Sequence, residues 1–205
     1  MKALVLYCHP SPTSFTAAVC DVVLQKLQAA GAEIRHRDLY AEGFDPTLAP
    51  AEWSDYEDCS RNTVPVSQYV DDVRWCDTLI FVYPTWWYGL PAMLKGWMDR
   101  VLLPGVAFHL SKEGIAPGLG HIQRLGVFTT CGASRWLTWY IGAPGRRLLV
   151  RGARLLCARN CKTTFAAHYR MDASTPTSRS RHLARVERLM ERFVGPAKPV
   201  RELAA

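Results

Sequence analysis

The chain has 205 residues, 49% hydrophobic and 21% charged, which is enough for one sizeable core and excludes a disordered or fibrous composition. No apolar run reaches the length of a membrane span, and the first apolar segment is too short for a signal peptide, so we expect a cytoplasmic protein without membrane insertion. The net charge of +7 is concentrated after residue 100, but no recognised nucleic-acid motif accompanies it, so nucleic acid is not the expected partner.

Periodicity divides the first hundred residues into alternating strands and helices. Short apolar, β-rich runs predict strands, and apolar positions spaced three or four residues apart predict helices. The elements expected here are a strand over residues 3–7, a helix over 15–30, a strand over 33–39, a helix over 66–75, a strand over 78–83 and a helix over 91–103. Pro84 is expected to end the third strand because it has no N–H for a ladder hydrogen bond.

The second half continues this alternation after a long loop. Residues 104–123 contain repeated glycines and prolines without a sustained period, which predicts a loop. The elements expected after it are a strand over residues 124–130, a helix over 136–151, a strand over 163–169 and a helix over 177–193. This order predicts one α/β domain over residues 1–195, with a parallel sheet covered by helices on both faces, and a tail over residues 196–205.

The loop after the first strand has the chemistry of a phosphate site. Carboxyl ends of parallel strands meet at one edge of the sheet, where ligands of α/β folds bind. Residues 8–14 offer hydroxyl groups and the free N–H groups of a helix start, which favour an anion. The loop has neither a Gly-x-Gly-x-x-Gly pattern nor a Walker lysine, so a Rossmann or P-loop site is disfavoured. An ordinary helix cap is the alternative interpretation.

Two further strand ends suit a flat ligand. Residues 84–88 place two indoles and a phenol after the third strand, although core packing or an oligomer interface would also explain them. Residues 129–133 follow the fourth strand with small side chains whose N–H groups and hydroxyls suit carbonyl and imide atoms. Together the three loops match the phosphate, ring and pyrimidine edge of a flavin.

The cysteines favour neither disulfides nor a metal. They number seven and lie mostly in apolar runs, which is typical of reduced thiols. Cys157 and Cys161 have the spacing to share a helical face with His168 nearby, but no second Cys/His pair accompanies them, so no metal site is expected.

The segment after the third strand reads YPTWWYGLPAMLKGWMDRV and resembles the NAD(P)H:quinone oxidoreductase family of flavodoxin-like flavoproteins. The first loop and the Thr-Thr-Cys-Gly run of residues 129–132 support the resemblance by their order and spacing. The resemblance implies a flavodoxin-like three-layer α/β/α sandwich with a five-stranded parallel sheet of order 2-1-3-4-5. It also implies a non-covalent flavin, FMN or FAD, and NAD(P)H as electron donor. The implied reaction is two-electron (hydride) reduction of a quinone-like acceptor by a ping-pong mechanism, in a homodimer with sites at the interface.

The same resemblance implies the residues of the site. Those expected to bind the cofactor are His9, Thr13, Ser14, Phe15, Pro84, Thr85, Trp86, Trp87, Tyr88, Thr129, Thr130, Cys131, Gly132 and Ala133. Backbone N–H groups of Trp87 and Tyr88 are expected near the reacting edge of the flavin, and those of Gly132 and Ala133 near its opposite carbonyl, where Tyr140 is a poorer candidate. Phe108 falls where relatives place an aromatic residue of the substrate pocket. Cys131 departs from the family pattern, and no catalytic Tyr/His pair carries over.

Two other classes of function remain open. A flavin-binding electron carrier or regulatory subunit without turnover of its own would have the same site, although flavodoxin-type carriers generally present acidic surfaces and this chain is basic. A basic interaction domain formed by residues 135–201 is the third interpretation, which salt-sensitive binding to DNA or RNA would reveal.

Overall fold

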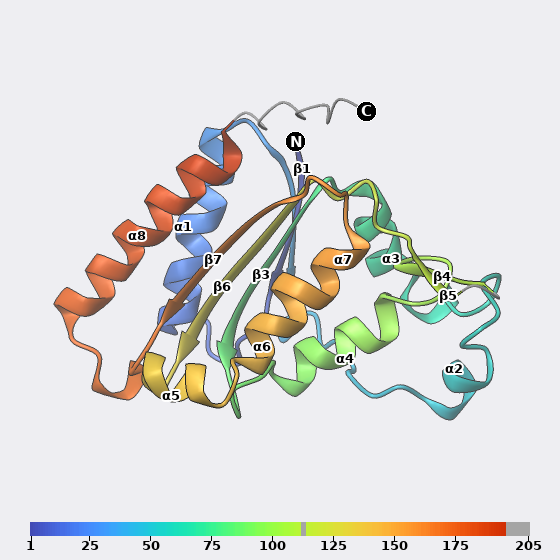
Figure 1. Ribbon diagram of the computed structural model, residues 1–205, viewed down its shortest axis with the longest axis horizontal. Coiled ribbons are helices and arrows are strands. Elements are labelled where there is room, and N and C mark those ends of the chain that lie inside the picture. Colours follow the sequence, from blue (N-terminus) through green and yellow to red (C-terminus); the bar gives the residue numbers. More distant parts are fainter. Residues whose placement is uncertain (112–113, 196–205) are drawn as a thin grey trace.

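A parallel five-stranded sheet in the order β2-β1-β3-β6-β7 forms the centre of the computed structural model, which describes residues 1–111 and 114–195 (Figure 1). Its strands are β1 (Lys2–Tyr7), β2 (Glu33–Asp38), β3 (Thr78–Thr85), β6 (Arg124–Cys131) and β7 (Lys162–His168). The flavodoxin-like fold and the 2-1-3-4-5 order expected from the sequence are confirmed. The expected tail, residues 196–205, lies outside the described residues.

The central strands are buried on both faces because nearly all their side chains are apolar. Along β1, Leu4 and Leu6 pack into the core on one side of the sheet. The alternate residues Ala3, Val5 and Tyr7 pack into the core on the other side. A parallel sheet with helices on both faces requires this kind of strand, which explains why the apolar runs predicted it well.

Helices form the two outer layers. One face of the sheet is covered by α1 (Phe15–Ala29) and α8 (Pro176–Val194), which lie side by side in Figure 1. The other face is covered by α3 (Ser67–Trp75), α4 (Ala92–Val101) and a continuous helical stretch over residues 144–156. The excursion after β2 contains only the short α2 (Pro50–Ser54) and the single 3-10 turn η1 (Val64–Val66). No helix within the described ranges is long and apolar enough to cross a membrane.

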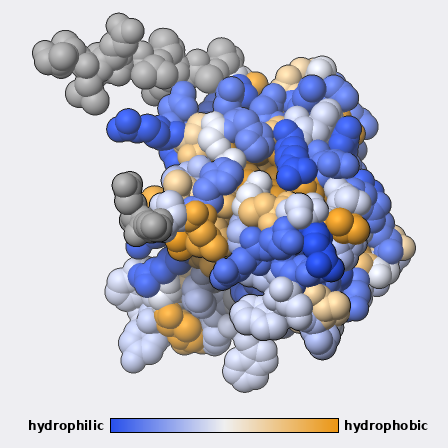
Figure 2. All heavy atoms as spheres, turned by 90° about the vertical axis from the view of Figure 1, so that its right-hand side faces the viewer, coloured by the Kyte–Doolittle hydropathy of each residue, from blue (hydrophilic) through white to orange (hydrophobic). Residues whose placement is uncertain are grey.

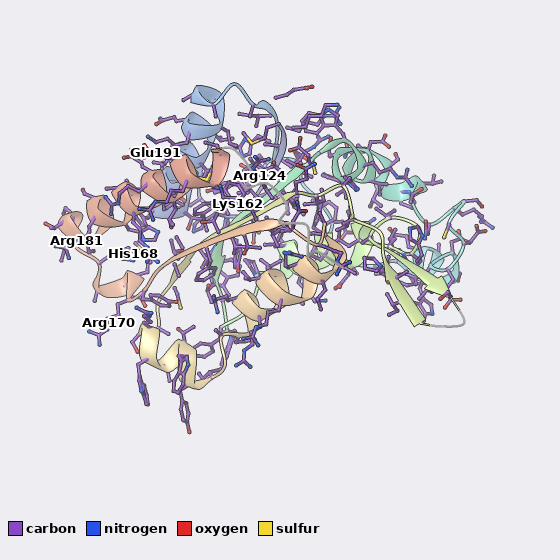
Figure 3. The ribbon with its side chains drawn as sticks, turned by 45° about the horizontal axis from the view of Figure 1, so that its top comes forward. Arg124, Lys162, His168, Arg170, Arg181 and Glu191 are labelled. Atoms are coloured by element: carbon purple, nitrogen blue, oxygen red, sulfur yellow. The ribbon has the colours of Figure 1, made fainter. Side chains whose placement is uncertain are left out.

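Basic side chains hold the carboxyl end of α8 at the amino ends of β6 and β7 (Figure 3). The Nε of Arg124 donates to the carbonyl oxygen of Phe193 at 3.2 Å, and the ammonium of Lys162 donates to the same oxygen at 3.3 Å. These contacts satisfy a carbonyl of the last helical turn and place positive charge at the negative end of the helix dipole. Part of the basic charge in the second half is therefore structural.

Strand β3 continues two residues beyond its expected end, and pairs with β6 as far as Thr85. The carbonyl of Val82 accepts a hydrogen bond from Cys8 at 3.0 Å, so Val82 faces the β1 side of the strand. Alternate residues face the same side, so Pro84 also faces β1, which has ended at Tyr7. The missing N–H of Pro84 therefore interrupts no ladder bond, and the prediction that it ends the strand is wrong.

The segment expected to be a loop, residues 104–123, contains a hairpin. β4 (Phe108–Ser111) pairs antiparallel with β5 (Gly114–Pro117). Both strands have four residues, and their side chains are mostly exposed. No alternation of buried and exposed positions marks such a short exposed ribbon in the sequence, so the expectation of an irregular loop is wrong.

The helix expected over residues 136–151 is broken. α5 (Arg135–Tyr140) ends before Gly142 and Ala143, whose φ angles are +92° and +49°. The chain then resumes with α6 (Pro144–Arg147), the π-helical η2 (Leu148–Ala153) and α7 (Arg154–Leu156). Two left-handed residues turn the chain, and Pro144 starts the next helix at a position where it needs no N–H. The local Gly-Ala-Pro signal therefore outweighs the helical period.

Candidate functional site

A cleft of about 790 Å³ opens at the edge of the sheet where the parallel strands end. The loops after β3 and β6 form most of its wall, and α5 and the 3-10 turn η3 (Met171–Ala173) complete it. Its lining residues are Thr85, Trp86, Trp87, Tyr88, Cys131, Gly132, Ala133, Leu137 and Asp172. All but the last two were expected from the sequence at a flavin site, so the structure brings two of the three predicted loops into one cleft.

The loop after β3 is a tight turn with two strained residues. The N–H of Gly89 donates to the carbonyl of Trp86 at 2.9 Å, and the two residues between them, Trp87 and Tyr88, have φ angles of +48° and +60°. Positive φ at both central residues is typical of a type I′ turn, which normally contains Asn or Gly. A bulky residue in this region costs roughly 1–2 kcal/mol. Such strain is concentrated at functional sites in proteins, where the surrounding structure maintains it.

This turn presents rings and backbone donors at the mouth of the cleft. The side chain of Trp87 is 95% exposed and that of Trp86 is 43% exposed. In the described part of the chain, the N–H groups of Trp87 and Tyr88 have no hydrogen-bond partner. Figure 2 shows pale side chains of intermediate hydropathy protruding along the lower edge of the molecule, the edge where the strands end in Figure 1. Exposed indoles beside unpaired donors suit a flat ligand with polar edges.

The end of β6 is joined to its neighbours by buried threonines. The hydroxyl of Thr129 lies 2.8 Å from that of Thr85, and the hydroxyl of Thr130 lies 3.0 Å from that of Thr16. These hydrogen bonds tie β6 to β3 and to the first turn of α1. Thr129 and Thr130 thus lie beneath the cleft and position its wall, and direct contact with a ligand remains a prediction for them.

The loop after β6 packs against the segment that follows β7. A Cβ atom on Gly132 would lie 2.7 Å from a carboxylate oxygen of Asp172, so any larger residue would require the side chain of Asp172 to move. The N–H of Arg170 donates to the carbonyl of Ala133 at 3.1 Å, and Arg170 has a φ of +54° (Figure 3). No partner is present in the described ranges for the N–H groups of Gly132 and Ala133. The small residues leave room and donors for a ligand.

The sequence analysis missed Leu137 and Asp172. Asp172 supplies a carboxylate to the cleft from a segment that follows β7. Its position just after the fifth strand was the available signal, because the carboxyl ends of all five parallel strands lie at the same edge. Leu137 had no such signal, since the way α5 (Arg135–Tyr140) packs decides which of its side chains faces the cleft.

The loop after β1 leads into α1 with free donors. The hydroxyl of Ser14 caps the helix by accepting the N–H of Ala17 at 3.1 Å. The N–H groups of Thr13, Phe15 and Thr16 have no partner among the described residues. Free N–H groups at the start of a 15-residue helix favour an anion, as the sequence analysis expected. These residues lie at the same sheet edge as the cleft but do not line it.

His9 adds an imidazole to this loop. Its Nδ1 lies 2.9 Å from the backbone nitrogen of Ser11, whose N–H it can accept, and 3.1 Å from the carbonyl oxygen of Ser11, to which it can donate, so the tautomer of the ring sets the direction of this contact. Partial burial lowers the pKa of His9 and so favours the neutral ring. In the tautomer protonated at Nε2, the neutral ring is a hydrogen-bond donor suited to a phosphate oxygen.

Three residues of the predicted site have other surroundings. The ring of Phe15 packs against His168 and His182 beneath α8, with ring centroids 5.2 and 6.0 Å away. The structure does not bring Tyr140 to the cleft, because its ring is 71% exposed and stacks on Trp136 at 5.5 Å. Phe108 lies in the β4–β5 hairpin, away from α5 in Figure 1, and does not line this cleft either.

Nothing in the described ranges resembles a metal centre. No three His, Cys, Asp or Glu side chains in these ranges converge as ligands. Cys161 precedes β7 and His168 ends it, so the whole length of the strand separates the two residues.

Residues 1–189 match a family described as having a flavodoxin-like fold. The chain is 34% identical over 137 residues to an uncharacterized NAD(P)H oxidoreductase of Haemophilus influenzae, covering 65% of this chain and 66% of that protein. It is also 34% identical over 125 residues to the ribosyldihydronicotinamide dehydrogenase (quinone) of Homo sapiens, covering 53% and 54% of the two chains. The aligned part thus spans between half and two thirds of these relatives.

The similarity to solved structures extends over nearly the whole chain. Smu.1420 from Streptococcus mutans superposes with a TM-score of 0.80 at 29% identity, covering 94% of this chain and all of that one. An NAD(P)H:quinone oxidoreductase from Methanothermobacter marburgensis also gives a TM-score of 0.80, over 97% of this chain and 99% of that one. Its sequence identity of 23% supports likeness of fold alone.

Proposed function

Because this chain belongs to the family with a flavodoxin-like fold, we propose that its cleft holds a non-covalent flavin, FMN or FAD, and that the protein uses NAD(P)H to reduce quinone-like aromatic acceptors. The observation that carries the proposal is the strained turn at Trp87 and Tyr88. It displays exposed rings and two unpaired backbone donors at a cleft of about 790 Å³. Relatives named as NAD(P)H oxidoreductases and quinone dehydrogenases support the same chemistry.

The residues at the sheet edge fit a flavin in three places. The aromatic turn would flank the flat ring system, and the free N–H groups of Gly132 and Ala133 would meet its polar edge. The helix start at Phe15, with the imidazole of His9, would hold the phosphate. Unpaired donors that would suit the ring edge and the phosphate of a flavin thus support the proposal in the part of the chain that the structure describes.

The protein contributes binding and orientation to the reaction. A bound flavin would supply the redox chemistry, which is hydride transfer between NAD(P)H and the acceptor. The indoles of Trp86 and Trp87 restrict donor and acceptor to flat groups lying in the cleft. The N–H groups of Trp87 and Tyr88 stabilise negative charge that develops beside them. Asp172 is the acidic residue of the lining and disfavours anionic acceptors, which leaves neutral quinones as the preferred class.

We propose further that the working form is a homodimer. Phe108 does not line the cleft of its own chain, so any role in the acceptor pocket requires Phe108 of the partner subunit. The same hairpin exposes Leu110 and Ile115 to 52% and 68%. Light scattering on the purified protein should give twice the mass of one chain. The variant Phe108→Ala should have a higher KM for the acceptor. A catalytically active monomer would contradict this part of the proposal.

The deciding measurement is the absorption spectrum of the purified protein, with mass identification of the released flavin. We expect a flavin spectrum and steady NADH or NADPH oxidation with menadione, with the parallel-line kinetics of a ping-pong mechanism. Protein that stays colourless after incubation with FMN and FAD would refute the proposal. Bound flavin without turnover would instead favour an electron carrier or regulatory subunit.

A matched pair of variants tests the site itself. Trp86→Ala should weaken flavin binding because Trp86 lines the cleft. Trp136→Ala removes an indole that is 66% exposed and does not line the cleft, so it should leave the flavin dissociation constant unchanged. An equal loss of flavin affinity in both variants would show that the exposed indoles affect the solubility or stability of the protein and do not bind flavin in the cleft.

A further inference from the structure

A second cavity, of about 490 Å³, lies at the outer side of β7. β7 is an edge strand, paired with β6 alone, so the ends of α5 and α6 and one side chain of α8 converge there. The polar and aromatic residues of its wall are Arg135, Thr138, Trp139, Arg146, Phe165, Tyr169 and Arg185. None of these residues was assigned a role by the sequence resemblance.

Three guanidinium groups face this cavity without an acidic partner. Among the described residues, the guanidinium groups of Arg135, Arg146 and Arg185 form neither a hydrogen bond nor an ion pair, and the lining contains no Asp or Glu. The three guanidinium groups line the cavity together with Tyr169, whose pKa is raised by burial and lowered by these neighbouring positive charges. Arg146 also lies 5.1 Å from the ring of Phe165. A pocket with this uncompensated charge favours an anion that accepts forked hydrogen bonds.

The cavity adjoins the cleft across α5. Leu137 lines the cleft, whereas the next two residues, Thr138 and Trp139, line the cavity. A small recess between them shares Tyr88 with the cleft and Tyr169 with the cavity. A ligand that lies over α5 can therefore place one end in each.

We propose that this cavity binds the 2′-phosphate and adenosine end of NADPH while the nicotinamide end lies in the cleft, so that NADPH is preferred over NADH. The inference rests on the proposed function and adds the identity of the electron donor. The arginines supply donors for the phosphate oxygens, and Trp139, 74% exposed, offers an indole face for the adenine. NADH lacks the 2′-phosphate and so makes no use of the three positive charges.

Turnover with both donors tests the inference. For Arg185→Gln and Arg146→Gln, the ratio of kcat/KM for NADPH to that for NADH should fall about ten-fold or more, because a charge-assisted phosphate contact is lost. Arg188→Gln removes the same charge from an exposed position of α8 outside the cavity, and its ratio should not change. An equal change for the two donors, or the same change in Arg188→Gln, would overturn the inference.

Direct binding separates this inference from the proposed function. By calorimetry on the flavin-loaded protein, 2′,5′-ADP should bind more tightly than 5′-AMP, and Arg185→Gln should remove about ten-fold of that difference. If neither donor is oxidised but this pattern holds, the proposed function fails and the nucleotide site stands. If turnover is normal and 2′,5′-ADP binds no better than 5′-AMP, the site fails and the proposed function stands.

Discussion

The backbone N–H of Gly145 donates to the carbonyl oxygen of Tyr88 at 3.1 Å, which joins the first turn of α6 to the aromatic turn of the cleft. The two backbones approach so closely that a Cβ atom on Gly145 would lie 3.2 Å from Gly89. The strained residues Trp87 and Tyr88 are thus supported by a segment that is distant in the sequence. This support explains how a turn with two bulky left-handed residues persists.

Gly145→Ala should therefore disturb the turn. The new methyl group must displace Gly89 by a few tenths of an ångström, so we expect flavin to dissociate several-fold more readily, as measured by fluorescence titration. Gly152→Ala is the matched control, because its Cβ would meet only Leu148, at an ordinary 3.8 Å, in the same helical stretch. It should gain up to about 1 kcal/mol of helix stability without altering flavin affinity. Equal flavin affinities in the two variants would contradict a role for the contact between Gly145 and Gly89.

Trp87→Gly should stabilise the flavin-free protein while weakening its function. Glycine adopts the φ of +48° without steric penalty, so the free energy of unfolding should rise by about 0.5–1 kcal/mol in urea titrations. Because the side chain is 95% exposed, little packing is lost. Trp87→Ala keeps the strained angle and should not show the gain. A destabilised Trp87→Gly protein would mean that the turn is not under strain.

Gly96→Ala should destabilise the whole fold. Gly96 lies in α4 directly against Pro46, and a Cβ atom there would lie 2.4 Å from the Cβ of Pro46. Because the new Cβ would also lie 2.3 Å from the backbone oxygen of Pro46, this clash should exceed the gain in helix propensity and lower the free energy of unfolding by about 1–3 kcal/mol. Urea titrations of Gly96→Ala and Gly152→Ala compare the free energies of unfolding of the two variants. A variant as stable as the parent would show that the excursion after β2 shifts freely.

Stability should fall on acidification because of a buried histidine pair. The ring centroids of His168 in β7 and His182 in α8 lie 5.2 Å apart, and His168 Nδ1 and His182 Nε2 have no hydrogen-bond partner in the described part of the chain (Figure 3 shows His168). Burial, then the neighbouring His168 and Arg185, lower the pKa of His182 to about 4. Burial also lowers the pKa of His168, with Arg179 contributing in the same direction.

The direction in which stability changes with pH follows from the pKa of His182 in the unfolded and in the folded protein. The unfolded ring takes up a proton near pH 6.5 and the folded ring only near pH 4, so its stabilising effect is complete above pH 6.5 and is lost as the pH falls toward 4. With partial solvation of the ring, we expect a loss of about 2 kcal/mol over this range. His182→Leu should reduce the slope of stability against pH in urea titrations between pH 4 and 6.5. An unchanged slope would exclude His182 as its source.

Much of the site could be read from local pattern. The apolar runs predicted the central strands β1, β3 and β6 because a strand buried on both faces needs apolar side chains at nearly every position. The loops after β1, β3 and β6 could be recognised because parallel strands bring their carboxyl ends to one edge. The Gly-Ala-Pro sequence at residues 142–144 is a local signal for the break, but it lies within a helical period that predicts one continuous helix.

The sequence by itself determined the order of strands and helices, the aromatic run and the glycines of the cleft, since these depend on residues close together along the chain. Only the tertiary structure decided which side of β3 Pro84 faces, that Asp172 closes the cleft and that Gly145 supports the turn at Tyr88. It also decided that three arginines from α5, α6 and α8 share one cavity. Each of these depends on the packing of segments far apart in the chain, where distance and direction are set by the whole core and leave no local signal in the sequence.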